Sequence, residues 1–260
     1  MGLGFFSRTF VKMRNDENSA KDKTKMELSF KDVVTNFAVD EETVNSWIEK
    51  KHLPCIMANE QYHFNYIELL DWAIENNIRL TPEILTLKDP DSYDKEILYQ
   101  ALSAGNIYYD ISGSKREEVL KSIVELLPLS PKLNKKSLWQ MLVAREKMMS
   151  TAIGNGIAIP HVRNPVVLQM ERPSVTLCFL KEPVDFKALD GKPISILFIL
   201  LSPSVKKHLA ILSRLAFCLQ NELLLKHLQE RAAREQLLAE IKVLELKIIS
   251  VLNKDELKKA

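Results

Sequence analysis

One segment of this chain, Ile194 to Leu201, is apolar at almost every position and is interrupted only by Ser195. A run of this length and composition is typical of a β-strand that is buried on both faces. A second apolar run of strand length extends from Ser174 to Lys181. Segments with helical spacing precede and follow these two runs, and helices interleaved with buried strands predict a layered α/β domain.

The predicted helices of this domain are residues 117–129, 135–149 and 206–228, and a glycine-bearing loop and strand occupy 153–162. Together they assign residues 94–245 to one domain. The remaining residues, 246–260, are helical in composition, and we expect them to form a frayed C-terminal tail.

The front of the chain has a different organisation. We expect a flexible basic tail over residues 1–25, a compact unit over 26–86 and a linker over 87–93. The compact unit contains a predicted helix over 28–37, Asp40 as the N-cap of a second helix, two short extended pieces around Ala58 to Glu60, and a third helix over 65–77. This is the order of elements in a winged helix-turn-helix.

The composition is that of a globular protein, with 46% apolar and 27% charged residues. No apolar run reaches the roughly 18 residues that a membrane-spanning helix needs, so we expect no stable membrane insertion. Cys55, Cys178 and Cys218 are widely separated and form no Cys-x-x-Cys pair, which argues against a zinc site or a disulfide framework. We therefore predict a cytoplasmic protein.

The segment from Arg145 to His161 carries the most chemical information. Gly154 and Gly156 allow a tight turn that brings backbone amides close to a ligand, and a proline stiffens the backbone just before His161. A neutral imidazole is a nucleophile near pH 7, so His161 is a candidate phosphoryl acceptor. Arg145 offers a planar fork to phosphate oxygens, and His208 begins a helix whose N-terminus favours anions.

Other roles for these residues stay open. His208 could be a simple helix-end residue, and Arg145 could be a surface partner of Glu146 or Glu117. His161 and His208 could together bind a metal, but two ligands without a third at matching spacing make a poor site. We therefore predict no metal.

The run Ser150 to His161, STAIGNGIAIPH, closely resembles the active-site signature of the mannitol, fructose and nitrogen-regulatory class of enzyme IIA of the bacterial sugar phosphotransferase system. Arg145 precedes it at the usual distance, residues 183–203 resemble a strand-loop-strand segment of that family, and residues 206–219 resemble its helix with a second histidine. The resemblance implies a mixed β-sheet flanked by helices and no cofactor. It also implies that His161 accepts phosphate from an HPr-type phosphocarrier, while His208 and Arg145 stabilise the phosphoryl group.

The compact front unit resembles the excisionase-like branch of the MerR-type helix-turn-helix group. The resemblance rests on Thr43-Val44, Trp47-Ile48, Leu53-Pro54 and Trp72. In such folds the second helix enters the DNA major groove. The candidate DNA contacts are its exposed residues: Thr43, Asn45, Ser46, Lys50 and Lys51.

The charge of residues 26–86 opposes DNA binding. Four basic residues stand against eleven acidic ones, which gives a net charge of −7. Lys and Arg supply most of the affinity for the phosphate backbone, so this acidic charge weakens the prediction of DNA binding. DNA and a regulatory protein therefore remain equal alternatives as targets of this unit. The basic residues of the N-terminal tail could restore some attraction.

Three functions are compatible with these features. The first is a regulatory protein that accepts a phosphoryl group on His161 and relays its phosphorylation state to DNA or protein targets. The second is a transport component that donates phosphate to a separate membrane sugar permease. The third is a non-catalytic binding module that has kept the fold.

Overall fold

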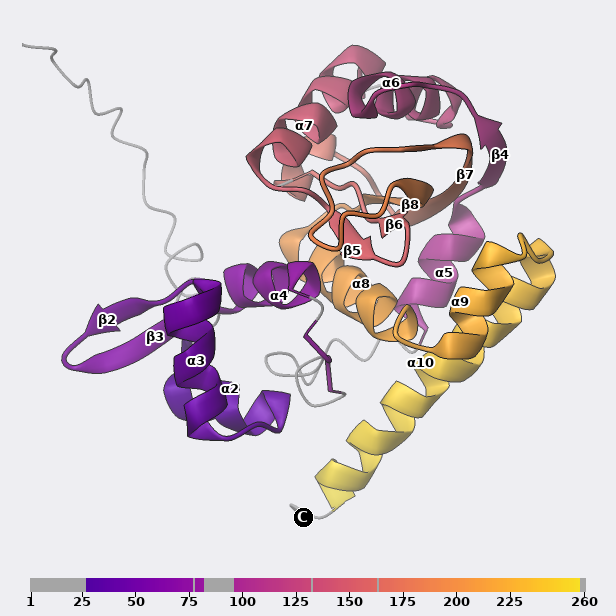
Figure 1. Cartoon of the computed structure of the whole chain (residues 1–260). Coiled ribbons are helices and arrows are strands. Elements are labelled where there is room, and N and C mark those ends of the chain that lie inside the picture. Colours follow the sequence, from indigo (N-terminus) through magenta and orange to yellow (C-terminus); the bar gives the residue numbers. More distant parts are fainter. Residues whose placement is uncertain (1–26, 77, 82–95, 132, 163, 258–260) are drawn as a thin grey trace, which may run out of the picture.

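The structure is a computed structural model that describes residues 27–76, 78–81, 96–131, 133–162 and 164–257 (Figure 1). The expected tail over 1–25 and linker over 87–93 lie outside these residues. We call residues 27–81 the front unit and residues 96–257 the sheet unit. None of the described helices is long and apolar enough to cross a membrane.

The front unit contains three helices and a small antiparallel sheet of strand order β1-β3-β2. Its elements are β1 (Glu27–Ser29), α2 (Phe30–Phe37), α3 (Glu41–Lys51), β2 (Ile56–Ala58), β3 (Gln61–Asn65) and α4 (Tyr66–Glu75). The order of helices and hairpin strands is the one predicted from the sequence. Asp40 caps α3 as expected, because its Oδ1 accepts a hydrogen bond from the Thr43 amide at 2.7 Å.

The prediction of a helix from residue 28 is wrong at its first two positions. Leu28 lies in β1, where it pairs with Phe64 of β3. The helix begins only after Ser29, whose side chain accepts from the Asp32 amide while the Asp32 carboxylate accepts from the Ser29 amide. This reciprocal cap fixes the helix start, and it leaves Leu28 free to join the sheet.

The sheet unit is built on a five-stranded mixed sheet of order β4-β7-β8-β6-β5. Its elements are α5 (Ile97–Ala104), β4 (Ile107–Ile111), α6 (Arg116–Leu126), α7 (Lys135–Met148), β5 (Ala152–Gly154), β6 (Ile157–Ala158), η3 (Pro165–Leu168), β7 (Ser174–Val184), β8 (Ile194–Leu201), α8 (Val205–Cys218), α9 (Glu222–Gln229) and α10 (Arg234–Leu257). Strands β7 and β8 are antiparallel, whereas β4 runs parallel to β7 and β6 runs parallel to β8. The predicted α/β architecture is confirmed.

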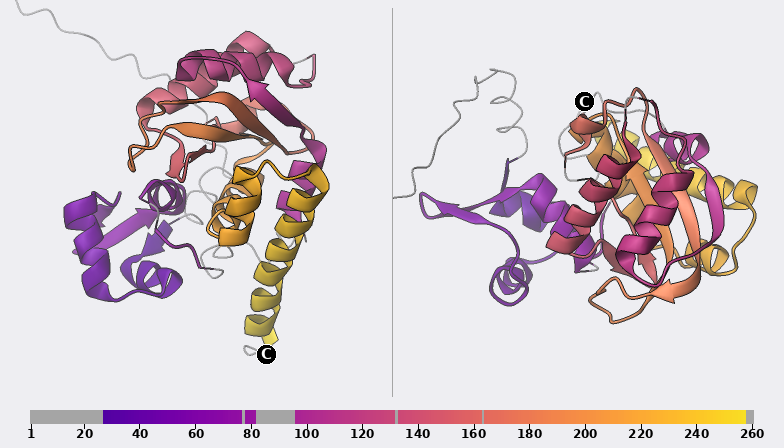
Figure 2. Two further views of the ribbon diagram at one scale, coloured as in Figure 1. Left: turned by 45° about the vertical axis from the view of Figure 1, so that its right-hand side comes forward. Right: turned by 90° about the horizontal axis from the view of Figure 1, so that it is seen from above.

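Strand β8 is buried on both faces, as its sequence predicts. Ile196, Phe198 and Leu200 belong to one core cluster, while the alternating Leu197 and Ile199 belong to the other. Figures 1 and 2 show α6 and α7 over one face of the sheet and α5, α8 and α10 over the opposite face. The period of two along an extended strand places successive side chains in these two separate cores.

Two predictions about the C-terminal helices are wrong. The single helix expected over 206–228 is two helices, because Asn221 begins α9 by accepting a hydrogen bond from the Leu224 amide at 3.0 Å. The tail expected to fray from residue 246 is helical as far as Leu257. Ile248 is fully buried in that segment, so tertiary packing supports the part of the helix that we expected to fray.

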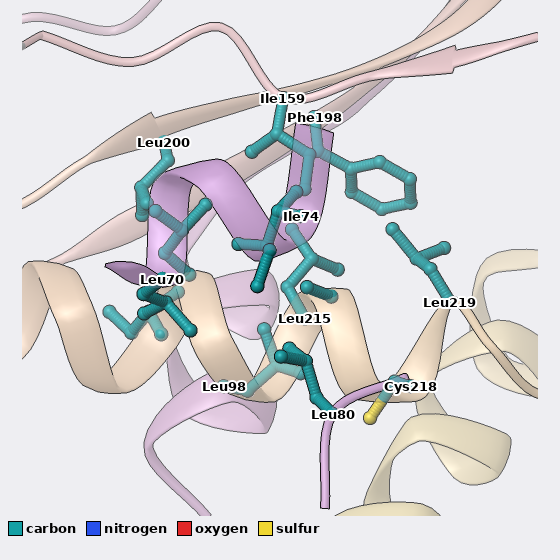
Figure 3. Packing of buried hydrophobic residues seen from close by; sticks show 14 of the residues in the cluster. Leu70, Ile74, Leu80, Leu98, Ile159, Phe198, Leu200, Leu215, Cys218 and Leu219 are labelled. Atoms are coloured by element: carbon teal, nitrogen blue, oxygen red, sulfur yellow. The ribbon is translucent and has the colours of Figure 1, made fainter. Parts of the chain in front are cut away.

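The front unit and the sheet unit share one hydrophobic core. Leu70 and Ile74 of α4, together with Leu80, belong to the same cluster of buried residues as Leu215 of α8 and Phe198 of β8. Figure 3 shows these side chains directed toward one another between the helices and the sheet. Helix α4 is therefore packed against the sheet unit as well as within its own unit.

Candidate functional site

His161 is held beside the C-terminal part of β8. It forms a parallel β-bridge with Leu200, and the Leu200 amide donates to the Pro160 carbonyl at 3.1 Å. Its Nδ1 lies 2.8 Å from the Ile159 carbonyl oxygen. Because a carbonyl oxygen only accepts, Nδ1 carries the proton and Nε2 keeps its lone pair.

The environment of His161 keeps its imidazole neutral. Burial, and then the positive charge of Arg145, lower its pKa to about 4, while the hydrogen bond to Ile159 acts in the opposite direction. The residue is 5% exposed. A neutral ring with a free Nε2 lone pair is a nucleophile at physiological pH.

His208 lies in the first turn of α8, which is capped by the hydroxyl of Ser204. Its ring centroid is 5.0 Å from that of His161. Burial, the nearby His161 and the charge of Arg145 lower its pKa well below the ordinary value. Its buried Nδ1 has no hydrogen-bond partner among the described residues, so it is available to an oxygen atom of a ligand.

Arg145, near the end of α7, completes the cluster and is 8% exposed. Its Nη1 donates to the Met149 carbonyl at 2.8 Å, and its Nη2 lies 3.8 Å from Oδ2 of Asp71 in α4. The alternative that Arg145 is a surface residue is wrong. Packing buries it beside the two histidines, and its ion-pair partner comes from the front unit.

Glu146 organises the backbone next to Arg145. Its buried carboxylate accepts hydrogen bonds from the Thr151 amide at 3.2 Å and from the Thr151 hydroxyl at 2.5 Å. Burial raises the pKa of this carboxyl, against the hydrogen bonds from Thr151. The pair fixes the turn between α7 and β5, which positions the strand that leads to His161.

A cleft of about 780 Å³ lies between the front unit and the sheet unit. Arg145, His161 and His208 line it from the sheet unit. Residues of the front unit line it as well: Lys51, His52, Pro54, Asn65, Glu68, Asp71, Trp72 and Asn76. The three residues that the sequence placed in one site are thus brought together, and the front unit forms part of the wall.

Gly154 and Gly156 form the tight turn that the sequence predicts. Both have a left-handed backbone, with φ of 87° and 73°, and they form the tight turn between β5 and β6. Neither lines the cleft, and the Asn155 amide between them donates to Asp190 at 3.2 Å. The glycines therefore shape the hairpin that precedes His161, and an amide contact from this loop to a ligand stays a prediction.

The candidate DNA contacts lie along α3. Asn45, Lys50 and Lys51 are exposed, whereas Thr43 and Ser46 are half-buried. Lys51 also lines the cleft opposite His161. The C-terminal end of α3 is therefore adjacent to the candidate site.

Asp71 is the functional candidate that sequence reasoning missed. Nothing in its local sequence marks it, because its contact with Arg145 depends on how α4 packs against the sheet unit. Among the described residues, no group of three or more His, Cys, Asp or Glu side chains is arranged to hold a metal ion.

Known proteins resemble this chain in sequence and in fold. The family model described as "Phosphoenolpyruvate-dependent sugar phosphotransferase system, EIIA 2" matches residues 100–243. The chain belongs to this family. The match covers most of the sheet unit, which we call the EIIA domain from here on, and it does not include the front unit.

Individual relatives agree with this assignment. A nitrogen regulatory protein of Pseudomonas aeruginosa is 38% identical over 122 residues, which are 46% of this chain and 77% of that protein. The fructose-specific EIIABC component of Bacillus subtilis is 30% identical over 142 residues, which are 54% of this chain but only 22% of that protein. The crystal structure of the nitrogen regulatory protein IIA-Ntr from Neisseria meningitidis has a TM-score of 0.50 and 30% identity, covering 56% of this chain and 99% of that one.

Proposed function

We propose that this protein accepts a phosphoryl group on Nε2 of His161 from the phosphohistidine of an HPr-type phosphocarrier. The observation that carries this proposal is the state of the acceptor. His161 is neutral because its pKa is lowered to about 4, and its Nδ1 is engaged by the Ile159 carbonyl. Only Nε2 is left to attack, in a residue that lines the cleft.

The transfer needs no cofactor. The Nε2 lone pair of His161 forms a bond to phosphorus as the bond between phosphorus and the donor's imidazole nitrogen breaks, and the bonding electrons return to that nitrogen. The proton stays on Nδ1, which continues to donate a hydrogen bond to the Ile159 carbonyl, and this bond supports the positive charge that develops on the ring. Arg145 and Nδ1 of His208, which has no hydrogen-bond partner in the described part of the chain, would hold phosphoryl oxygens during and after transfer.

The proposed output is regulatory. Relatives named nitrogen regulatory proteins match the EIIA domain, and here a front unit forms part of the wall of the cleft. We propose that the phosphorylation state is relayed through this unit, which has the element order of a winged helix-turn-helix, to a DNA or protein target.

The phosphoryl step is tested with purified enzyme I, HPr and 32P-phosphoenolpyruvate. The wild type is expected to be labelled on His161, and His161→Asn is expected to lose the label. His52→Asn is the matched control, because His52 lines the same cleft and its left-handed helix C-cap position accommodates asparagine. Equal labelling of the wild type and His161→Asn would refute the assignment, and no label on any variant would favour a binding module.

Binding of the protein to DNA is tested by a separate measurement. A gel shift in low and moderate salt, with and without phosphorylation, is expected to show binding that weakens as salt rises if α3 contacts DNA. The variant Lys50→Ala/Lys51→Ala is expected to weaken it further. No shift at low salt would leave a protein as the target.

A transport role is the second candidate, and the similarity to a fructose-specific EIIABC component favours it. It would require His161 to pass its phosphoryl group to a separate sugar permease. Measurement of sugar uptake in a strain that lacks the gene distinguishes the transport role from the regulatory role. Reduced phosphorylation-dependent uptake of one sugar supports transport, whereas unchanged uptake supports regulation.

A further inference from the structure

Asp71 connects the front unit to the candidate phosphoryl site. Its Oδ2 lies 3.8 Å from Nη2 of Arg145, and its side chain is 25% exposed. Asp71, Arg145 and His161 line both the large cleft and a small adjoining cavity of about 10 Å³. An acidic side chain of the front unit thus pairs with the guanidinium that is positioned to bind phosphoryl oxygens on His161.

Packing on both sides holds the helix that bears Asp71. Leu70 and Ile74 of α4 are buried in the core shared with the EIIA domain (Figure 3). The next residue, Trp72, donates from its indole nitrogen to the Lys51 carbonyl at 2.9 Å, and its ring lies 5.4 Å from that of Trp47 in α3. A change in the position of α4 is therefore transmitted directly to α3, the helix with the candidate target contacts.

The charges at the site make this contact sensitive to phosphorylation. Both histidines are neutral because their pKa values are lowered, so the unmodified site combines the positive Arg145 with the negative Asp71. A phosphoryl group itself carries a charge of about −1.5 to −2 at neutral pH. It would compete with Asp71 for Arg145 and would also repel the Asp71 carboxylate, so two effects act in the same direction.

We propose that Asp71 is the residue through which the front unit senses the phosphorylation state of His161. Phosphorylation displaces the Asp71 carboxylate from Arg145 and loosens the packing of α4 against the EIIA domain. The contacts of Trp72 with α3 then transmit the change in α4 to α3. This inference rests on the proposed phosphorylation of His161, and it adds the route by which that event reaches the front unit.

The coupling is reciprocal. If phosphorylation weakens the docking of α4, then docking of α4 through Asp71 weakens phosphorylation by the same factor. Asp71→Asn, which keeps the shape of the side chain and removes its charge, is therefore expected to shift the phosphoryl equilibrium with HPr several-fold toward this protein. Glu68→Gln is the matched control, because Glu68 lies on the same helix and lines the same cleft but is exposed.

Hydrogen exchange followed by mass spectrometry tests the proposal on the full chain. In the wild type, phosphorylation is expected to raise exchange several-fold in peptides covering α4. Asp71→Asn is expected to show raised exchange before phosphorylation and little further change, while Glu68→Gln is expected to respond as the wild type does.

The outcomes distinguish failure of the sensing role of Asp71 from failure of the proposed phosphorylation of His161. Intact mass and peptide mapping report whether His161 carries phosphate in each sample. Phosphate on His161 with unchanged exchange in α4 would overturn the sensing role of Asp71 and leave the proposed function standing. An identical response of Asp71→Asn and the wild type would also overturn it. Absence of phosphate on His161 in the wild type would overturn the proposed function and this inference together.

Discussion

The buried, neutral state of His161 predicts a specific dependence of stability on pH. Its pKa is about 4 in the folded protein against an ordinary value of 6.5, so the unfolded chain binds a proton that the folded protein excludes. Stability is complete above pH 6.5 and is lost as the pH falls toward the folded-state pKa. Between pH 8 and pH 5, this single residue is expected to lower the free energy of unfolding by about 2 kcal/mol.

The assay is urea unfolding of the wild type and His161→Asn at pH 8, 6.5, 5.5 and 5. The asparagine Nδ2 takes the place of the imidazole Nδ1 and can still donate to the Ile159 carbonyl, but the side chain does not titrate. Between pH 8 and pH 5, the free energy of unfolding of the variant is expected to fall by about 2 kcal/mol less than that of the wild type. This difference does not depend on the absolute stability of the variant. His208 is present in both proteins, but His161 contributes to its lowered pKa, so the difference between the two curves reports His161 together with its effect on His208.

Parallel curves for the two proteins would refute the reasoning. They would mean that His161 takes up a proton as readily in the folded protein as in the unfolded chain. In that case, burial beside Arg145 would not lower the pKa of His161, and its imidazole would be protonated in part near neutral pH.

Three further predictions concern the scaffold. Glu245→Gln is expected to lower the free energy of unfolding by about 3 kcal/mol, because the buried Arg214 loses the carboxylate 2.6 Å away; a urea midpoint unchanged from wild type would contradict this. Gly105→Ala is expected to lower stability by about 3 kcal/mol, since a Cβ there would stand 1.9 Å from the Val175 carbonyl oxygen, and an unaltered thermal melting curve would count against it. Asn221→Ala removes the cap of α9 and is expected to cost about 1 kcal/mol in guanidinium unfolding; no loss, or a gain, would show that the cap is dispensable.

Local sequence signals predicted well those features that depend on neighbours along the chain. The continuous apolar run of β8 placed a strand buried on both faces, and the side chain of Asp40 marked the start of α3. The same signals failed where two local structures compete. Leu28 fits a helical pattern, but Ser29 caps the helix one residue later and Leu28 pairs with β3.

The site was predictable in part. The signature around His161 identified the candidate acceptor, and the order of the segments indicated His208 and Arg145 as its neighbours. The glycines correctly predicted the tight turn before His161, because a left-handed backbone favours glycine. Glu146 follows Arg145 directly in the sequence, but its hydrogen bonds to Thr151 depend on a turn that the local sequence does not predict.

By itself, the sequence determined the α/β class, the family and the candidate acceptor histidine, since these follow from periodicity and from residues close together in the chain. Only the tertiary structure decided what surrounds that histidine. The low pKa of His161 comes from burial, and the pairing of Arg145 with Asp71 comes from a helix 74 positions earlier in the chain that packs against the EIIA domain. Desolvation and contacts between distant segments arise only when the chain is folded, and these two effects bury His161 and bring Asp71 of the front unit to Arg145.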